Sequence, residues 1–305
     1  MTDHPVPISR RAALGGFAGA GLLLPRAAGA QTALRTRPIP HGGEALPVVG
    51  VGTAGVFDVG PNERGGPAAV VRALLAGGGT VIDTAGSYGE SENVIGAILA
   101  ETGLGPKSFV ATKLEEYRPG GEKAEAEGSL ARLRLKRVDL LMLHNVTDPN
   151  QEMGGLNALK AEGLCRYTGI TTTYKNAYDA AEAITRRARP DFLEIDYALD
   201  NRSAESRLLP AAMAAGTGVL VALPLGRGRL FRKALGKPLP GWAAEFDCGS
   251  WAQFFLKWLI GHPAVTAVIP GTANPAHMRD NLGAGHGRLP DAKMRARMVQ
   301  HIESL

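Results

Sequence analysis

Short apolar runs rich in β-branched residues recur along this chain, and segments with helical patterns separate them. There are eight such runs, at residues 47–53, 80–84, 109–113, 138–144, 166–171, 192–196, 218–222 and 265–269. Each run is continuously apolar rather than alternating, which is typical of strands in a parallel sheet that helices cover. Eight strand-helix units in about 275 residues have the number and size of a (β/α)8 TIM barrel, so we predict this α/β fold.

A doubly wound open sheet is the alternative that the same alternation allows. Such a sheet normally carries a G-x-G-x-x-G turn after its first strand. Here Gly50-Val-Gly52-Thr53-Ala54-Gly55 has that glycine spacing, but the eight strand-helix units have the number and size of a barrel, so the barrel is favoured.

Three segments fall outside the repeat. Residues 34–47 are predicted to form an N-terminal hairpin that caps the barrel floor, with its turn at Gly42-Gly43. Residues 226–248 lengthen the seventh strand-helix connection, and residues 290–305 predict an extra C-terminal helix.

The first thirty residues have the pattern of an export signal. Ser9-Arg10-Arg11 precedes an uncharged stretch rich in Ala, Gly and Leu, and Ala28-Gly29-Ala30 forms a small-x-small cleavage site. The paired arginines are similar to those of a twin-arginine signal. The uncharged stretch at 12–25 would span only about 21 Å as a helix, against a bilayer core of about 30 Å. We therefore expect a signal peptide at 1–30 and a barrel domain at 31–305. The expected location is the periplasm, or the cytoplasm if residues 1–30 do not act as an export signal.

Composition excludes several classes of function. The formal net charge is +5, and no run of about five Lys or Arg residues marks a nucleic-acid site. No uncharged apolar stretch reaches the length of about 18 residues that a transmembrane helix needs. His, Cys and carboxylate residues do not cluster with metal-ligand spacing, so we expect no metal site. We expect a monomer that binds a small molecule.

Four polar residues stand where a barrel carries its chemistry. Asp83, Lys113 and His144 end three consecutive predicted strands, and Tyr88 lies in the loop after the first of them. Neighbouring parallel strands lie less than about 5 Å apart, so we expect these side chains to converge. Taken one at a time, these residues also fit structural roles: a buried ion pair, a lone histidine and a surface tyrosine. All four at one level of the barrel predict an active site.

The same residues carry a resemblance to a known family, the aldo-keto reductases. The segments that resemble it are Val81-Ile-Asp83-Thr-Ala-Gly-Ser-Tyr88-Gly-Glu-Ser-Glu-Asn, Ala-Thr-Lys113 and Leu-Met-Leu-His144, with further matches at 47–53, 224–228 and 262–272. The resemblance extends over residues 34–285. It implies an oxidoreductase that reduces an aldehyde, ketone or sugar with NADP(H), NAD not being excluded. It also implies a catalytic tetrad made of Asp83, Tyr88, Lys113 and His144.

The chemistry of these side chains suits such a reaction. A tyrosine with a pKa near 10 can donate a proton, and we expect Lys113 to stabilise the phenolate and lower the pKa of Tyr88. Asp83 would hold the ammonium, and His144 would orient the carbonyl oxygen. No side chain supplies a hydride, so the hydride must come from a reduced nicotinamide.

The resemblance also implies cofactor contacts after several strands. They fall on Gly52, Thr53, Thr171, Thr172, Asp196, Pro224, Leu225, Gly226, Gly271, Thr272, His277 and Asn281. Some depart from the family: Thr171-Thr172 replaces Ser-Asn, and Asp196 replaces Gln. Ala222 replaces the aromatic residue under the nicotinamide, Leu223 the serine beside it, and Gly271 and His277 the usual Lys and Arg at the ribose phosphate. The lost stacking alone is worth about 0.5–1.5 kcal/mol, so we expect altered or weakened nicotinamide binding.

Three hypotheses remain open, because free NADPH is not expected outside the cytoplasm. The protein is an ordinary cytoplasmic NADP(H) reductase, or an exported one with a tightly held nucleotide. In the third hypothesis it is an exported barrel that serves as a non-redox proton-transfer enzyme or as a carbonyl- or sugar-binding protein. A Tyr88→Phe change separates an enzyme, which loses turnover, from a binding protein, which keeps its affinity.

Overall fold

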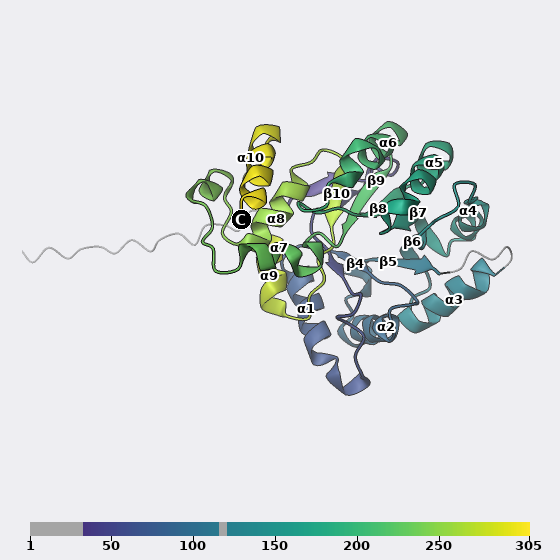
Figure 1. Ribbon diagram of the computed structural model, residues 1–305. Helices are drawn as coiled ribbons and strands as arrows, with labels where there is room; N and C mark the ends of the chain where they lie inside the picture. Colours follow the sequence, from purple (N-terminus) through teal and green to yellow (C-terminus); the bar gives the residue numbers. More distant parts are fainter. Residues whose placement is uncertain (1–32, 116–120) are drawn as a thin grey trace, which may run out of the picture. The chain divides into compact units, whose positions relative to one another are not determined.

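The structure is a computed structural model that describes residues 33–115 and 121–305. Within these residues, eight parallel strands form one sheet, and helices alternate with them along the chain (Figure 1). The strands are β3 (Val51–Gly52), β4 (Val81–Asp83), β5 (Phe109–Leu114), β6 (Val138–Leu143), β7 (Cys165–Thr172), β8 (Phe192–Asp196), β9 (Gly218–Ala222) and β10 (Val265–Val268). Each predicted run overlaps one of these strands, so the (β/α)8 fold is confirmed. The predicted signal peptide lies outside the described residues.

The first and last strands of the sheet meet and nearly close the barrel. The strands follow one another in the order β10-β9-β8-β7-β6-β5-β4-β3, and parallel bridges join Val49 to Val268 and Gly52 to Gly271. The strand β3 is shorter than the predicted run 47–53, in which Pro47 ends β2 and Val49 makes only an isolated bridge at this seam. A Cβ atom on Gly52 would lie 2.9 Å from the carbonyl oxygen of Ile269, so the close approach requires glycine.

The barrel interior changes from apolar to charged along the strands. Alternate residues of a strand face the same side, and on β5 Phe109 and Ala111 belong to the interior apolar cluster. Lys113 follows them at the same spacing, as Glu194 follows Phe192 on β8. Apolar side chains therefore fill the N-terminal layers, and charged side chains occupy the layer at the C-terminal ends of the strands.

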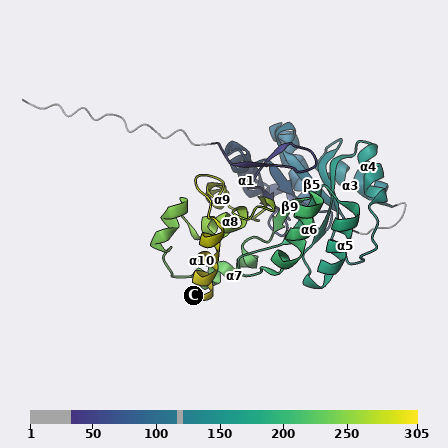
Figure 2. The same ribbon diagram turned by 90° about the horizontal axis from the view of Figure 1, so that it is seen from above.

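Helices cover the outside of the barrel (Figures 1 and 2). They are α1 (Gly65–Ala76), α2 (Ser91–Thr102), α3 (Glu122–Leu133), α4 (Gly154–Ala161), α5 (Tyr178–Ala188), α6 (Leu208–Ala215), α8 (Trp251–Ile260) and α9 (Pro275–Gly283). Short 3-10 helices lie in the connections: η1 (Pro61–Glu63), η2 (Gly105–Lys107), η3 (Lys175–Ala177) and η4 (Ser203–Ser206). The helices α1 and α9 contact each other, which completes the ring around the seam of the sheet.

The predicted N-terminal hairpin is present and caps the barrel floor. Strand β1 (Thr36–Pro38) pairs antiparallel with β2 (Ala45–Pro47). Ile39 and Leu46 are buried in the same cluster as the barrel interior, so the hairpin closes the N-terminal end. The guanidinium of Arg37 donates hydrogen bonds to the carbonyl oxygens of Ile260, His262 and Val265, which ties the hairpin to the end of α8 and the start of β10.

Two further additions lie later in the chain, one directly after the seventh strand of the barrel and one after α9. The connection after β9 contains η5 (Gly226–Gly228), α7 (Arg229–Ala234) and η6 (Gly241–Phe246). The predicted C-terminal helix is α10 (Ala292–Glu303), which begins after Asp291, whose side chain accepts a hydrogen bond from the backbone N–H of Met294 at 2.7 Å. Its buried residues Met298 and Ile302 join the main core, so α10 packs against the barrel.

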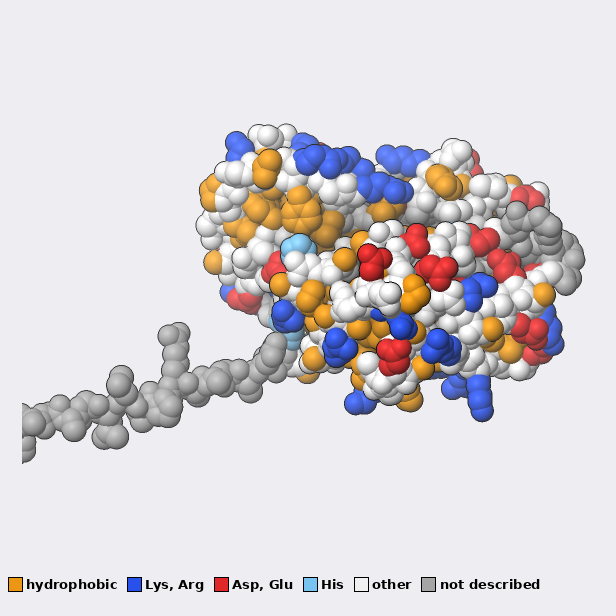
Figure 3. Space-filling model, turned by 90° about the horizontal axis from the view of Figure 1, so that it is seen from below, with side chains coloured by type: hydrophobic (Ala, Val, Ile, Leu, Met, Phe, Trp, Pro, Cys, Tyr) orange, Lys and Arg blue, Asp and Glu red, His pale blue; other side chains and the backbone are white. Residues whose placement is uncertain are grey.

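Charge is mixed on the molecular face in Figure 3. Lys and Arg side chains occur toward both the upper and the lower edge of this face, and Asp and Glu side chains lie between them. On this face, the positive net charge of the sequence is therefore not gathered into one patch.

Candidate active site

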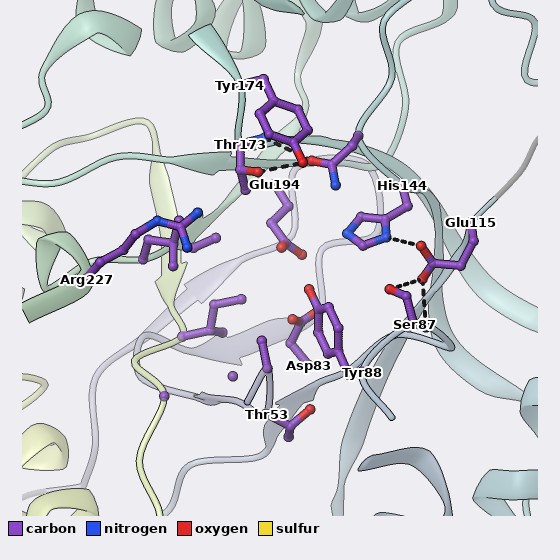
Figure 4. Close-up of a pocket in the computed structure, with 17 residues that line it drawn as sticks. Thr53, Asp83, Ser87, Tyr88, Glu115, His144, Thr173, Tyr174, Glu194 and Arg227 are labelled. Carbon is purple, nitrogen blue, oxygen red and sulfur yellow. Dashed lines mark hydrogen bonds and ion pairs between the residues drawn. The ribbon is translucent and has the colours of Figure 1, made fainter. Parts of the chain in front are cut away.

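A cavity of about 520 Å³ opens at the C-terminal ends of the strands (Figure 4). Its lining residues are Gly52, Thr53, Ala54, Asp83, Ser87, Tyr88, Glu115, His144, Asn145, Thr173, Tyr174, Glu194, Ala222, Leu223, Arg227, Ile269 and Gly271. The hydroxyl of Tyr88, the carboxyl of Glu194 and the imidazole of His144 point into it, and Arg227 lies on the opposite side from Glu115 (Figure 4). Titratable groups from separate elements therefore meet in one hollow.

Lys113 is fully buried and holds Asp83 next to the cavity. Its ammonium donates to both carboxylate oxygens of Asp83, at 2.7 and 2.8 Å, and to the carbonyl oxygen of Thr84 at 2.9 Å. A second carboxylate, Glu194, lies 3.6 Å from the same nitrogen. Burial alone would lower the pKa of Lys113, but the charges of Asp83 and Glu194 outweigh it and raise this pKa. Lys113 is therefore a fixed, buried cation next to Asp83, which lines the cavity.

Tyr88 lies between this cation and His144. The ring centroid of Tyr88 lies 5.1 Å from Nζ of Lys113 and 5.9 Å from the centroid of the His144 ring. Burial raises the pKa of Tyr88 above its ordinary value, although the Lys113 ammonium lowers it. Lys113 thus acts in the expected direction, but burial outweighs it. The phenol remains protonated near neutral pH and can act as a proton donor.

His144 has a carboxylate partner that the sequence analysis did not identify. Nδ1 of His144 lies 2.6 Å from Oε2 of Glu115, and because an ionised carboxylate only accepts, Nδ1–H donates this bond. Burial alone would raise the pKa of Glu115, but hydrogen bonds from His144 and Ser87 lower it. The partner fixes the ring tautomer, so that Nε2 is the nitrogen left for a ligand.

The four predicted catalytic residues do come together, with small differences in their strand positions. Asp83 ends β4 as expected, but β5 continues one residue beyond Lys113, and His144 follows the last residue of β6. The exact strand end matters little here, because the alternation of side chains keeps Lys113 on the interior face.

Seven of the twelve predicted cofactor residues line one or both of two adjacent cavities. Gly52, Thr53 and Gly271 line the first. A second cavity, of about 480 Å³, is lined by Leu225, Phe231, Ser250, Trp251, Ala252, Gly271, Thr272, His277, Asp280 and Asn281. Gly271 lines both cavities, so five of the predicted residues mark the second hollow and three the first.

The other five predicted cofactor residues, Thr171, Thr172, Asp196, Pro224 and Gly226, line neither of these cavities. Strand β7 runs through Thr172, so the side chains that reach the cavity come after it, from Thr173 and Tyr174. On β8 the cavity is lined by Glu194, two residues before Asp196. On both strands, the residues that line the cavity therefore lie one to two positions away from those that the resemblance implies.

Backbone strain gathers around the first cavity. Three lining residues that are not glycine adopt positive φ: Asn145 (50°), Leu223 (52°) and Arg227 (51°). The Asn145 side-chain oxygen accepts hydrogen bonds from the backbone N–H and the hydroxyl of Thr173, both at 3.1 Å, which holds this conformation. Such conformations cost energy and cluster at functional sites. No local sequence signal marks Leu223 or Arg227, since these two residue types rarely adopt positive φ.

No helix in residues 33–115 and 121–305 is both long enough and apolar enough to cross a membrane. Within the same residues, no group of three or more His, Cys, Asp or Glu side chains could hold a metal ion.

Comparison with known proteins gives consistent matches. The model of the Aldo/keto reductase family matches residues 48–302. The methylglyoxal reductase YeaE of Escherichia coli strain K12 is 30% identical over 260 residues, which cover 83% of this chain and 90% of that protein. An aldo-keto reductase of Mycolicibacterium smegmatis is 32% identical over 248 residues, covering 78% and 81%. Among solved structures, an aldo-keto reductase from Klebsiella pneumoniae in complex with NADPH has a TM-score of 0.73 at 24% identity, covering 88% of this chain and 95% of that one.

Proposed function

This chain belongs to the aldo/keto reductase family, and we propose that it reduces an aldehyde or a ketone to an alcohol with NADPH. The observation that carries the proposal is that Tyr88, Asp83 and His144 line one cavity, while the buried ammonium of Lys113 bonds Asp83 and lies near the Tyr88 ring. The family match favours an NAD(P)H-dependent oxidoreductase over the alternative of a non-redox binding protein.

The residues present fit a nicotinamide dinucleotide. Two cavities adjoin at Gly271, which suits an elongated ligand with one end in each. The buried Oγ1 of Thr53 and Oε2 of Glu194 have no hydrogen-bond partner among the described residues, which leaves polar atoms for a ligand in the first cavity. When bound there, the reduced nicotinamide supplies the hydride for the carbonyl carbon.

The second cavity would hold the other end of the dinucleotide. Asn274 caps α9, its side chain accepting from the backbone N–H of Ala276 at 2.8 Å, and Thr272 and Asn281 line the wall beside it. Among the described lining residues, His277 is the one side chain able to carry a positive charge toward a ribose phosphate. Both oxygens of Asp280 already accept hydrogen bonds, from Ser250 at 2.7 Å and Gln253 at 2.8 Å. NADH lacks the ribose phosphate that His277 would face, so NADH should be compared with NADPH in binding experiments.

The side chains of the first cavity supply the proton and the orientation. Tyr88 donates the proton to the carbonyl oxygen, and the buried ammonium of Lys113 stabilises the phenolate that remains. Nε2 of His144, directed by Glu115, faces the ligand and orients that oxygen. Asp83 keeps Lys113 in place through two hydrogen bonds.

The substrate we propose is a small polar carbonyl compound, and a sugar falls within this class. Ser87, Asn145, Thr173 and Arg227 add hydrogen-bonding groups to the cavity wall. Methylglyoxal is the first substrate to test, since the E. coli relative is named for its reduction.

We further propose that the protein is a monomer, which size-exclusion chromatography with light scattering would test.

The decisive experiment follows NADPH oxidation with methylglyoxal and a panel of aldehydes and ketones. Wild type should turn over, and Tyr88→Phe should lose about 10²- to 10⁴-fold in kcat while still binding NADPH. Tyr167→Phe is the matched control, because it removes a phenol that bonds Glu44 at the barrel floor, away from the cavity. Full turnover by Tyr88→Phe would overturn the assignment of Tyr88. No oxidation of NADPH by wild type with any carbonyl compound would favour the binding-protein alternative.

A further inference from the structure

Glu194 is a second carboxylate on a single buried lysine. Its side chain is almost fully buried within the barrel, and its Oε2 lies 3.6 Å from Nζ of Lys113. All the short hydrogen bonds of that ammonium go to Asp83 and Thr84. Oε2 of Glu194 therefore has no hydrogen-bond partner among the described residues, although the carboxyl is aimed into the cavity (Figure 4).

The buried group contains two carboxyl groups, Asp83 and Glu194, but only one cation, Lys113. With Lys113 charged, ionisation of both Asp83 and Glu194 would leave one net negative charge in a buried site. An uncompensated buried charge is costly, and a carboxyl group in that position gains a proton instead. Asp83, which accepts two short hydrogen bonds from the ammonium, is the carboxylate that the geometry keeps ionised. Glu194, with the longer contact and the unpartnered oxygen, is the one that the geometry protonates.

The other charged groups near Glu194 are few. On the neighbouring strands its register partners are Thr171 and Leu220, which carry no charge. The titratable or charged groups that face it or share its cavity and strand are Asp83 of β4, Tyr88 after β4, Lys113 of β5, Asp196 of β8 and, across the cavity, Glu115, His144 and Arg227. Burial raises the pKa of Glu194 to about 8, the charge of Asp83 adds to this, and Lys113 opposes it.

We propose that Glu194 is a positioning residue that carries a proton while Tyr88 acts as the acid, so that the buried group formed with Asp83 and Lys113 stays neutral overall. This inference rests on the proposed reductase function and deepens it. When Glu194 loses its proton, its negative charge opposes formation of the Tyr88 phenolate. Tyr88 then becomes a weaker proton donor, and reduction slows.

The first test measures protonation without using activity. Glu194→Gln keeps the shape of a neutral glutamic acid and cannot ionise. A glutamate in an unfolded chain titrates near pH 4.3, so between about pH 4.3 and 8 the folded wild type binds the extra proton. Wild type should therefore lose stability relative to Glu194→Gln as pH rises through this window. The unfolding constant of wild type relative to the variant should rise by up to about tenfold per pH unit and level off above pH 8.

The second test measures the pH dependence of reduction. In wild type, kcat/KM for the carbonyl substrate should fall with a midpoint near pH 8, and in Glu194→Gln this step should be absent. Glu101→Gln is the control, since Glu101 is an exposed partner of Arg64 on the outer surface and should keep the wild-type profile.

The outcomes separate this inference from the proposed function. A relative unfolding constant that stays flat from pH 5 to 9 shows that Glu194 is ionised throughout, which overturns the proposal even in an active enzyme. A stability step with superimposable kcat/KM profiles shows a proton that does not influence Tyr88, and it overturns the positioning role. If the protein reduces no carbonyl compound, the stability step still tests the protonation.

If Glu194→Gln does not fold, infrared spectra of wild type labelled with ¹³C-glutamate replace the comparison with this variant. The carboxylic-acid band should disappear with a midpoint near pH 8, and its absence at pH 6 overturns the proposal.

Discussion

The Glu115 carboxylate accepts a hydrogen bond from Nδ1 of His144 across 2.6 Å. Its other oxygen accepts from the backbone N–H and the hydroxyl of Ser87, at 3.1 and 2.8 Å. Ser87 directly precedes Tyr88, so one carboxylate links the loop that carries the proposed acid to the residue that orients the carbonyl. This link sets the relative position of two groups that come from different strand-helix units.

We predict that Glu115→Ala lowers kcat/KM by about 10- to 100-fold, the usual effect of removing a partner that orients a functional histidine. The His144 ring would then be free to change tautomer and orientation. Binding of NADPH should change little, because Glu115 lies opposite Arg227 in the first cavity and does not line the second cavity (Figure 4). Glu101→Ala serves as the surface control. Wild-type kcat/KM in Glu115→Ala would show that His144 needs no partner.

Lys113→Met should destabilise the protein strongly. Lys113 is fully buried, and its removal leaves the Asp83 carboxylate without its cation. Breaking one side of a buried ion pair typically costs about 3–5 kcal/mol. Urea unfolding at neutral pH measures the change, and the double variant Lys113→Met/Asp83→Asn should recover part of the loss. A loss below about 1 kcal/mol in the single variant would contradict the structural role assigned to the pair.

Gly271→Leu should block the junction between the two cavities. Gly271 lines both of them, and a Cβ atom there would lie 3.3 Å from the carbonyl oxygen of Gly52. We expect the Kd for NADPH to rise at least tenfold, equivalent to about 1.4 kcal/mol, with an unchanged circular dichroism spectrum. Unchanged affinity in a folded variant would mean that the dinucleotide does not pass Gly271.

The export proposal predicts a mature protein that begins at Gln31, after the Ala28-Gly29-Ala30 site. Sequencing the N-terminus of protein from the periplasmic fraction checks this. Replacing Arg10 and Arg11 by Lys should leave the full-length chain in the cytoplasm. A wild-type product that starts at Met1 and stays in the cytoplasm would refute export and favour the ordinary cytoplasmic reductase.

The barrel could be predicted from the sequence because each strand is a continuous apolar run at regular spacing. The meeting of Asp83, Lys113 and His144 followed from the same regularity, since equal positions on parallel strands lie at one level of the barrel. Glu194 was accessible to this logic as well, because it follows Phe192 by two residues on an interior-facing strand. Extending the alternation of interior and exterior side chains by one step along β8 would have identified Glu194.

Other parts of the site had no such signal. Glu115 reaches His144 through a side-chain contact between two different strand-helix units, which no local pattern reveals. The positive φ values of Leu223 and Arg227 depend on how the loop after β9 packs over the cavity. The resemblance implies cofactor contacts at Thr171, Thr172 and Asp196, whereas the cavity is lined one to two residues away, because strand ends cannot be placed to within two residues from sequence.

Titration of the purified protein with NADPH, followed by fluorescence after any bound nucleotide has been removed, tests the central claim most directly. The account predicts saturable binding with a Kd between about 1 μM and 1 mM, followed by NADPH oxidation when a carbonyl substrate is added. Absence of binding across that range would contradict it, because the Tyr88–Lys113–Asp83–His144 group would then have no hydride donor to work with.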